Sequence, residues 1–138
     1  MTFFDRLRER IDAVDSVVSV GLDPDPDRLP DSVADADLPR WAFNRRIIDA
    51  THDHAACYKP NAAFYEDSDG WRALQETIAY AHGKDVPVLL DAKRGDIGNT
   101  ARQYAKILDD DHGPAADAIT VNAYLGRDSL DPFLSQAD

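Results

Sequence analysis

The sequence predicts an α/β protein built around a parallel sheet. Short β-branched segments alternate with amphipathic helical patterns at a spacing of roughly 30 residues, which is the pattern of successive βαβ units. An apolar run at residues 86–90 leads directly into Asp91-Ala92-Lys93-Arg94-Gly95-Asp96, and α/β proteins place their chemistry at the carboxyl ends of parallel strands. A length of 138 residues suits one domain and is too short for two ordinary ones.

The first half of the chain is divided by helical periodicity and by proline. Thr2 precedes a helical pattern of apolar residues and is a candidate N-cap. The first strand ends at Pro24 and Pro26, because proline cannot continue a helix or a central strand. The polar segment that follows contains further prolines and is expected to be a loop. The elements predicted in this half are, in order, a helix at residues 4–14, a strand at 16–22, a loop at 27–39, a helix at 43–50 and a strand at 55–58.

The second half repeats the same alternation. Ser68 or Asp69 is the candidate N-cap of the third helix, and Gly83 is expected to end that helix in a left-handed conformation. The elements predicted in this half are, in order, a helix at residues 71–81, a strand at 86–90, a helix at 101–108, a strand at 117–122 and a helix near 130–134 in the tail 123–138.

Acidic residues dominate the charge of the chain. Aspartate and glutamate number 26 against 15 lysines and arginines, and the net charge of −11 repels nucleic acid and anionic membranes, so neither is expected as a partner. Acid-rich surfaces are common among proteins of a high-salt cytoplasm, where salt screens the repulsion between exposed charges. No apolar run approaches the roughly 20 residues of a membrane span, and the N-terminus lacks a signal-peptide pattern, so a cytoplasmic protein is expected. The single cysteine, Cys57, fits a reducing compartment and is expected to be a buried, unreactive thiol.

Ionisable residues follow the first three predicted strands. Asp23 follows the first, Lys59 the second, and Asp91 with Lys93 the third. Because side chains two residues apart on a strand share a face, Asp91 and Lys93 are expected to project to the same side. The carboxyl ends of parallel strands open onto one rim, so these four residues should converge there, with Asp96 arriving from the next loop. The alternatives are a structural salt-bridge network or solvated strand ends without a role, but a buried ionic network is a poor source of stability.

Four segments of the chain resemble one family. The segment at residues 91–101, Asp-Ala-Lys-Arg-Gly-Asp-Ile-Gly-Asn-Thr-Ala, closely resembles the active-site signature of the orotidine 5′-phosphate decarboxylase family. The other three segments look like the same family in the same order. An isolated Asp-x-Lys-x-x-Asp would be less specific, because sugar-phosphate decarboxylases and aldolases related by fold also use it. The four segments are Gly21-Leu22-Asp23-Pro24, Tyr58-Lys59-Pro60-Asn61-Ala62-Ala63-Phe64-Tyr65-Glu66, Asp91-Ala92-Lys93-Arg94-Gly95-Asp96-Ile97-Gly98-Asn99-Thr100-Ala101 and Thr120-Val121-Asn122-Ala123-Tyr124-Leu125-Gly126-Arg127-Asp128.

The resemblance implies a TIM (β/α)8 barrel, of which residues 1–138 hold the N-terminal half, about the first four βα units, with no second domain. Four parallel strands leave two unpaired edges, so the isolated chain is expected to be unstable or oligomeric. The implied activity is that of a carboxy-lyase, which converts orotidine 5′-monophosphate to UMP and carbon dioxide in pyrimidine biosynthesis. No metal and no other cofactor is expected.

The resemblance also implies roles for individual residues. Lys93 would deliver a proton to pyrimidine C6, and Asp91 would lie against the substrate carboxylate. Lys59 and Asp96 would complete the network of alternating charge and hold ribose hydroxyls, whereas Asp23 would bind the nucleoside part.

A homodimer with shared active sites is a further implication, because the Asp-Ile-x-x-Thr part of the family signature is supplied across a dimer interface. Asp96, Ile97 and Thr100 would then serve the neighbouring subunit's site. Asn61 and Asn122 are additional candidates for substrate binding.

Two alternatives to this function stay open at the level of the sequence. The first is a sugar-phosphate decarboxylase or aldolase of the same fold, which Mg²⁺-dependent turnover would favour. The second is an inactive fragment or interaction subunit that keeps the motif by descent, which failure to bind a pyrimidine nucleotide would favour.

Overall fold

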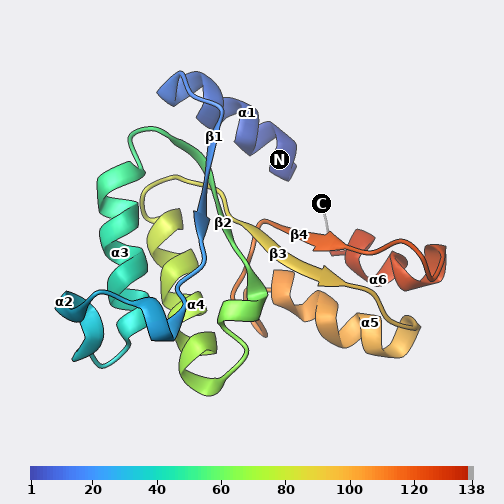
Figure 1. The fold of residues 1–138 in the computed structure, drawn as a ribbon. Coiled ribbons are helices and arrows are strands. Elements are labelled where there is room, and N and C mark those ends of the chain that lie inside the picture. The colour runs from blue at the N-terminus through green and yellow to red at the C-terminus, as the bar shows by residue number, and fades with distance from the viewer. Residues whose placement is uncertain (137–138) are drawn as a thin grey trace.

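Four parallel strands lie side by side in chain order in the computed structural model, which describes residues 1–136 (Figure 1). β1 pairs with β2 and β3 with β4, while the isolated bridges Tyr58↔Val88 and Asn61↔Asp91 join β2 to β3. Strand, helix and next strand follow one another as in a βα barrel, so the chain forms a partial barrel of about four βα units, as predicted. Residues 137 and 138, the last two of the predicted domain, lie outside the described residues. The strands are β1 Val18–Leu22, β2 Ala55–Pro60, β3 Leu89–Arg94 and β4 Ala118–Val121.

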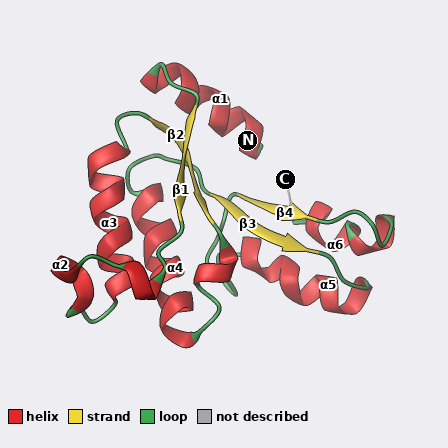
Figure 2. Cartoon of the chain, viewed as in Figure 1, coloured by secondary structure: helices red, strands yellow, loops and turns green. Residues whose placement is uncertain are grey.

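Helices cover the strands from outside. Figure 2 shows α3 and α4 beside β1 and β2, and α5 and α6 beside β3 and β4. The main core lies between strands and helices, where Ile48, Tyr58, Ile78 and Leu90 are completely buried. The α-helices are α1 Phe3–Val14, α2 Asp31–Ala34, α3 Pro39–Thr51, α4 Ser68–His82, α5 Gly98–Ala105 and α6 Asp131–Leu134. No helix among residues 1–136 is both long enough and apolar enough to cross a membrane.

The predicted first helix and its cap are confirmed. The Thr2 hydroxyl accepts a hydrogen bond from the Asp5 N–H (3.2 Å), and the Asp5 carboxylate accepts one from the Thr2 N–H (3.0 Å), which together form a capping box. The helix docks beside the start of β2, where the Arg10 guanidinium donates to the Ala55 carbonyl (3.1 Å). Cys57 is buried, as expected, and its thiol donates to the Ser19 hydroxyl (3.1 Å).

The predicted loop at residues 27–39 is wrong, because the segment contains helical structure. A 3-10 turn at Pro26–Arg28 and the short helix α2 occupy it, and α3 already begins at Pro39. Proline interrupts strands and helix interiors, but its fixed φ also suits the first turn of a helix, where its missing N–H costs nothing. Each of these three helical segments has a proline at its first turn or immediately before it.

Both ends of α4 also differ from the prediction. Its N-cap is Asp67, whose carboxylate accepts from the Gly70 N–H (2.7 Å), and not Ser68 or Asp69. Gly83 is right-handed, with φ −63°, and the left-handed turn falls instead on Asp85 at φ 59°.

The third strand lies later in the chain than predicted. The expected strand at residues 86–90 overlaps β3 at Leu89 and Leu90, but the strand continues through the charged motif to Arg94, which pairs with Val121 of β4. The prediction ended the strand at the first charged side chain, whereas ladder pairing uses only backbone groups. Asp91 and Lys93 therefore lie on the strand itself.

Candidate active site

A cluster of two lysines around one aspartate lies at the carboxyl ends of β2 and β3. The Nζ atom of Lys93 is 2.6 Å from Oδ2 of Asp91, and the Nζ atom of Lys59 is 3.7 Å from the same oxygen. The prediction that Asp91 and Lys93 project to the same side of β3 is confirmed. Three of the four residues expected to converge at the rim therefore meet there.

Thr120 on β4 completes this cluster. Its hydroxyl donates to Oδ1 of Asp91 (2.9 Å) and accepts from the backbone N–H of Lys93 (2.9 Å). Both carboxylate oxygens of Asp91 are thus engaged, one by an ammonium and the other by a hydroxyl. Thr120 lies within the fourth family-like segment, but the sequence predicts no role for it, because a threonine in a strand is most simply a β-branched packing residue.

The charges of the cluster reinforce one another. Hydrogen bonds from Lys93 and Thr120, with the positive charges of Lys93 and Lys59, hold the pKa of the Asp91 carboxyl below its ordinary value. The side chain of Asp91 is 15% exposed, while that of Lys93 is 66% exposed, so the carboxylate is sheltered and the ammonium is open to a ligand. Such an arrangement presents a fixed cation, able to donate a proton, beside a fixed anion.

Lys93 has an unusual backbone. Its φ of 52° lies in the left-handed region, which a residue with a side chain adopts only when its surroundings hold it there. The hydrogen bond from its N–H to Thr120 is one such restraint. The position of the ammonium therefore depends on the Thr120 hydroxyl as well as on its contact with Asp91.

Asp23 does not join the cluster, contrary to the expected convergence. It lies exposed just after β1, and within residues 1–136 it makes no ion pair with Lys59 or Lys93. The end of β1, immediately before Asp23, is held by the buried Tyr65 hydroxyl, which donates to the Leu22 carbonyl (2.7 Å).

Asp96 also stays outside the cluster within this chain. Its carboxylate accepts a hydrogen bond from the Ile97 N–H (2.8 Å) at the start of α5. Ile97 is 69% exposed, and Thr100 lies partly buried in the first turn of the same helix. The roles of these three residues in a neighbouring subunit stay predictions.

The two candidate asparagines support turns at the rim. The side-chain oxygen of Asn61 accepts from the Ala63 N–H (3.1 Å), and that of Asn122 accepts from the Tyr124 N–H (2.9 Å). A Cβ atom at Gly95 would lie only 3.2 Å from that of Asn122, so the turn after β3 packs closely against the end of β4.

Groups able to hold a metal ion are not gathered in the described part of the chain. Among residues 1–136, no three His, Cys, Asp or Glu side chains lie close enough together to share a cation. A hollow between α3 and α4, lined by Trp41 and Arg45 among others, shares no residue with the cluster around Asp91. The candidate site is therefore defined by its charged side chains and their hydrogen bonds.

The fold and the cluster define a class of protein, a βα-barrel protein with an Asp-x-Lys site at the carboxyl ends of its strands. Within that class, the chain belongs to the orotidine 5′-phosphate decarboxylase / HUMPS family, whose model matches residues 16–138.

Proteins named orotidine 5′-phosphate decarboxylase are close in sequence. That of Haloarcula marismortui is 85% identical over the whole chain, which covers 50% of the relative, and that of Natronomonas pharaonis is 80% identical, with 51% of the relative covered. The chain thus spans about half the length of the curated relatives it matches. Both organisms are haloarchaea, which agrees with the high-salt surroundings that the acidic composition indicates.

Solved structures agree with the assignment. The crystal structure of a Toxoplasma gondii protein described as a putative orotidine-monophosphate decarboxylase matches with a TM-score of 0.86 and 47% identity, over 97% of this chain and 45% of that one. A Streptomyces avermitilis protein described as a putative orotidine 5′-phosphate decarboxylase matches with a TM-score of 0.83 and 36% identity, over 99% of this chain and 49% of that one.

Proposed function

We propose that this chain supplies the first half of an orotidine 5′-phosphate decarboxylase, a carboxy-lyase that forms UMP and carbon dioxide in pyrimidine biosynthesis. The observation that carries the proposal is the contact between the Lys93 ammonium and the Asp91 carboxylate (2.6 Å) at the end of β3. The names of the relatives described above support the nucleotide as substrate over a sugar phosphate.

Lys93 is the proton donor in this proposal. The bond between pyrimidine C6 and the carboxylate breaks, carbon dioxide leaves, and the electron pair stays on C6. The Lys93 ammonium transfers a proton to that carbon and becomes an amine, which gives UMP. Because the ring delocalises the C6 charge poorly, a cation fixed beside it stabilises the transition state more than an ion that must reorganise.

Asp91 holds that cation in place. Its own pKa is lowered by Lys93 and Thr120, so it stays ionised at neutral pH and presents a negative charge 2.6 Å from the Lys93 ammonium. It would also lie against the carboxylate that the substrate loses.

The remaining candidates bind the rest of the nucleotide. Lys59, already directed at Asp91, and Asp96 would hold ribose hydroxyls, and Asp23 would bind the nucleoside. Asn61 and Asn122, at the ends of two strands, are further binding groups.

A homodimer with shared sites is part of the proposal. The 69% exposure of Ile97, an apolar side chain beside Asp96 and one turn from Thr100, supports a contact there with a second subunit. No metal or organic cofactor takes part in the proposed reaction. Action in the cytoplasm is also proposed, supported by the acidic composition and the single thiol.

The test is decarboxylation of orotidine 5′-monophosphate, followed by ultraviolet absorbance at high and low salt. Lys93→Ala removes the proposed donor, and Lys106→Ala, at an exposed lysine after α5, is the matched control. Turnover that survives Lys106→Ala, is lost in Lys93→Ala and needs no Mg²⁺ supports the proposal. Unchanged turnover in Lys93→Ala contradicts it, and no turnover by any variant would show that this half is inactive without further strands.

A further inference from the structure

Glu66 and Arg94 form an ion pair behind the candidate site. Nη2 of Arg94 lies 2.7 Å from Oε1 of Glu66, with side chains 23% and 55% exposed. Glu66 closes the Lys59-to-Glu66 segment, and Arg94 lies next to Lys93, so the pair joins the two segments that carry the lysines. Neither residue has a role in the proposed chemistry.

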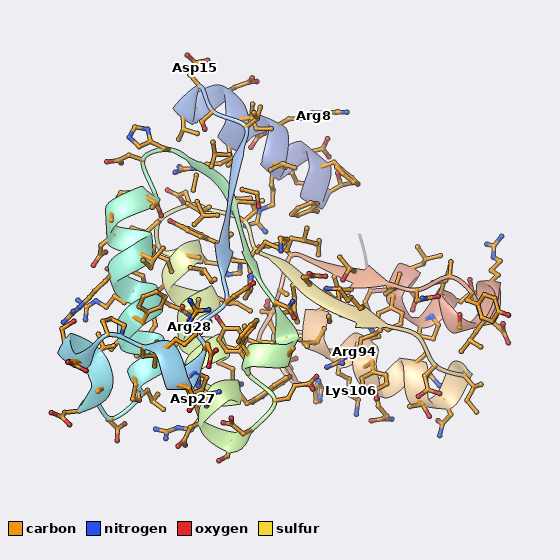
Figure 3. All side chains as sticks on the ribbon, viewed as in Figure 1. Arg8, Asp15, Asp27, Arg28, Arg94 and Lys106 are labelled. Atoms are coloured by element: carbon orange, nitrogen blue, oxygen red, sulfur yellow. The ribbon has the colours of Figure 1, made fainter. Side chains whose placement is uncertain are left out.

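Arg94 is held by more than its partner carboxylate. Its guanidinium carbon lies 5.0 Å from the centre of the Tyr104 ring on α5, within the range of a cation–π contact. Its Nε atom is buried without a hydrogen-bond partner among residues 1–136, so the Glu66 carboxylate and the Tyr104 ring are the contacts that hold the guanidinium. Figure 3 shows Arg94 beside β3, on the side of α5.

The backbone next to Arg94 is the strained part of the site. Lys93 has a φ of 52°, and the chain is held at Lys93 by its N–H bond to Thr120 and at the next residue by the Asn122 N–H bond to the Arg94 carbonyl (2.6 Å). A left-handed conformation of this kind persists only where its neighbours restrain it. The contacts of the Arg94 side chain with Glu66 and Tyr104 therefore restrain the residue next to Lys93.

The Glu66 end reaches Lys59 through a short, ordered segment. Asn61 pairs with Asp91, and its side chain begins the 3-10 turn Ala62–Phe64, which leads to Glu66. Lys59 lies two residues before Asn61. The segment from Lys59 leads through this turn to Glu66, and the ion pair connects Glu66 to Arg94, the neighbour of Lys93. The two lysines are therefore linked through the Glu66–Arg94 pair as well as through Asp91.

We propose that Glu66 and Arg94 are positioning residues that fix the Lys59 and Lys93 ammonium groups around Asp91. This inference rests on the proposed function for its effect on turnover, but its structural consequence exists without substrate. An exposed ion pair with no such link would contribute little to stability and nothing to the geometry of the site.

The test compares Glu66→Gln with Glu76→Gln, which removes the same charge from an exposed position on α4. The Asp91 carboxyl is titrated by carbon NMR in the free chain, and the unfolding midpoint is measured beside it. We expect the pKa of Asp91 to rise in Glu66→Gln, because the lysine contacts that lower it loosen, and to stay unchanged in Glu76→Gln. Loss of the Glu66 charge through space alone would lower the pKa of Asp91, so a rise is specific to displaced lysines.

A second variant tests the other side of the pair. Arg94→Lys keeps the charge but loses the planar group that reaches Glu66 and Tyr104 together, so the pKa of Asp91 should rise here too. Where the chain turns over, we expect kcat to fall by about tenfold in both variants while KM changes less, since misplaced groups affect the reacting atoms most.

The outcomes separate the two proposals. An unchanged pKa of Asp91 in Glu66→Gln, whether or not the unfolding midpoint falls, overturns the positioning role and leaves an ordinary ion pair. A raised pKa with no turnover in any variant, wild type included, supports the positioning role and counts against activity of this chain alone.

Discussion

The hydroxyl of Thr120 on β4 donates a 2.9 Å hydrogen bond to the carboxylate of Asp91 on β3. Through this contact a residue of β4 stabilises the negative charge of a residue on β3. The bond favours the ionised form of Asp91, which in turn faces both lysines of the site.

Replacement of Thr120 by valine tests this contact. Thr120→Val keeps the branched shape but removes the hydroxyl, so we expect the pKa of Asp91 to rise and the free energy of unfolding to fall by about 1 kcal/mol. Carbon NMR titration and urea unfolding measure the two effects. An unaltered pKa of Asp91 would show that the two lysines keep this carboxyl ionised without the hydroxyl.

A second prediction concerns acid stability and the buried carboxylate of Asp117, which immediately precedes β4. Burial by itself would raise its pKa, but hydrogen bonds from His82 (2.7 Å) and the Val88 N–H (2.7 Å), with the nearby charge of Arg6, outweigh it and leave the pKa lowered. A carboxyl with a lowered folded pKa contributes stability above its unfolded value, near 3.8, and loses that contribution as pH falls through the folded value.

Asp117→Asn should therefore lower stability at neutral pH, by about 2 kcal/mol, and much less below pH 3 or so. The measurement is urea unfolding across the pH range in constant salt. Asp110→Asn, at an exposed position, is the control for general loss of acidic charge. If both variants lost the same free energy of unfolding at every pH, Asp117 would not contribute to the pH dependence of stability.

The sequence predicted most of the fold because its strands and helices carry clear periodic patterns. The helix after Thr2 and the parallel order of the strands came from capping and periodicity, which act locally. The loop prediction for residues 27–39 was wrong for a local reason as well, because proline begins helices as readily as it ends strands. The extension of β3 to Arg94 depends on pairing with β4, which is far away in the sequence.

The candidate site shows the same division. Alternation along one strand was enough to place Asp91 and Lys93 on one face, and parallel topology was enough to bring Lys59 to them. The contribution of Thr120 and the exclusion of Asp23 depend on distances between strands, which no pattern along the chain encodes.

A third prediction concerns the buried hydroxyl of Tyr65. It donates to the Leu22 carbonyl (2.7 Å) and accepts from the Asn44 amide (2.9 Å), and burial raises its pKa. Tyr65→Phe leaves both groups without this partner in a closed core, so the free energy of unfolding should fall by about 2 kcal/mol. The measurement is the urea midpoint, with Tyr124→Phe as control because that ring is 93% exposed. Equal midpoints in the two variants would mean that the Leu22 carbonyl finds another donor.

The last prediction follows from the outer strands, since β1 and β4 each pair with one neighbour among residues 1–136. Unpaired backbone groups on an outer strand can pair with another chain, and apolar side chains lie exposed on both strands, Val18 at 53% and Val121 at 38%. We expect the isolated chain to associate as its concentration rises, which sedimentation velocity measures over a dilution series at high salt.

Val18→Lys should weaken the association, because a lysine on an outer strand opposes further pairing, whereas Val17→Lys, just before β1, should weaken it less. A chain that stays monomeric at all concentrations and unfolds in one sharp transition would contradict this prediction. The unpaired edges of β1 and β4 would then not cause association.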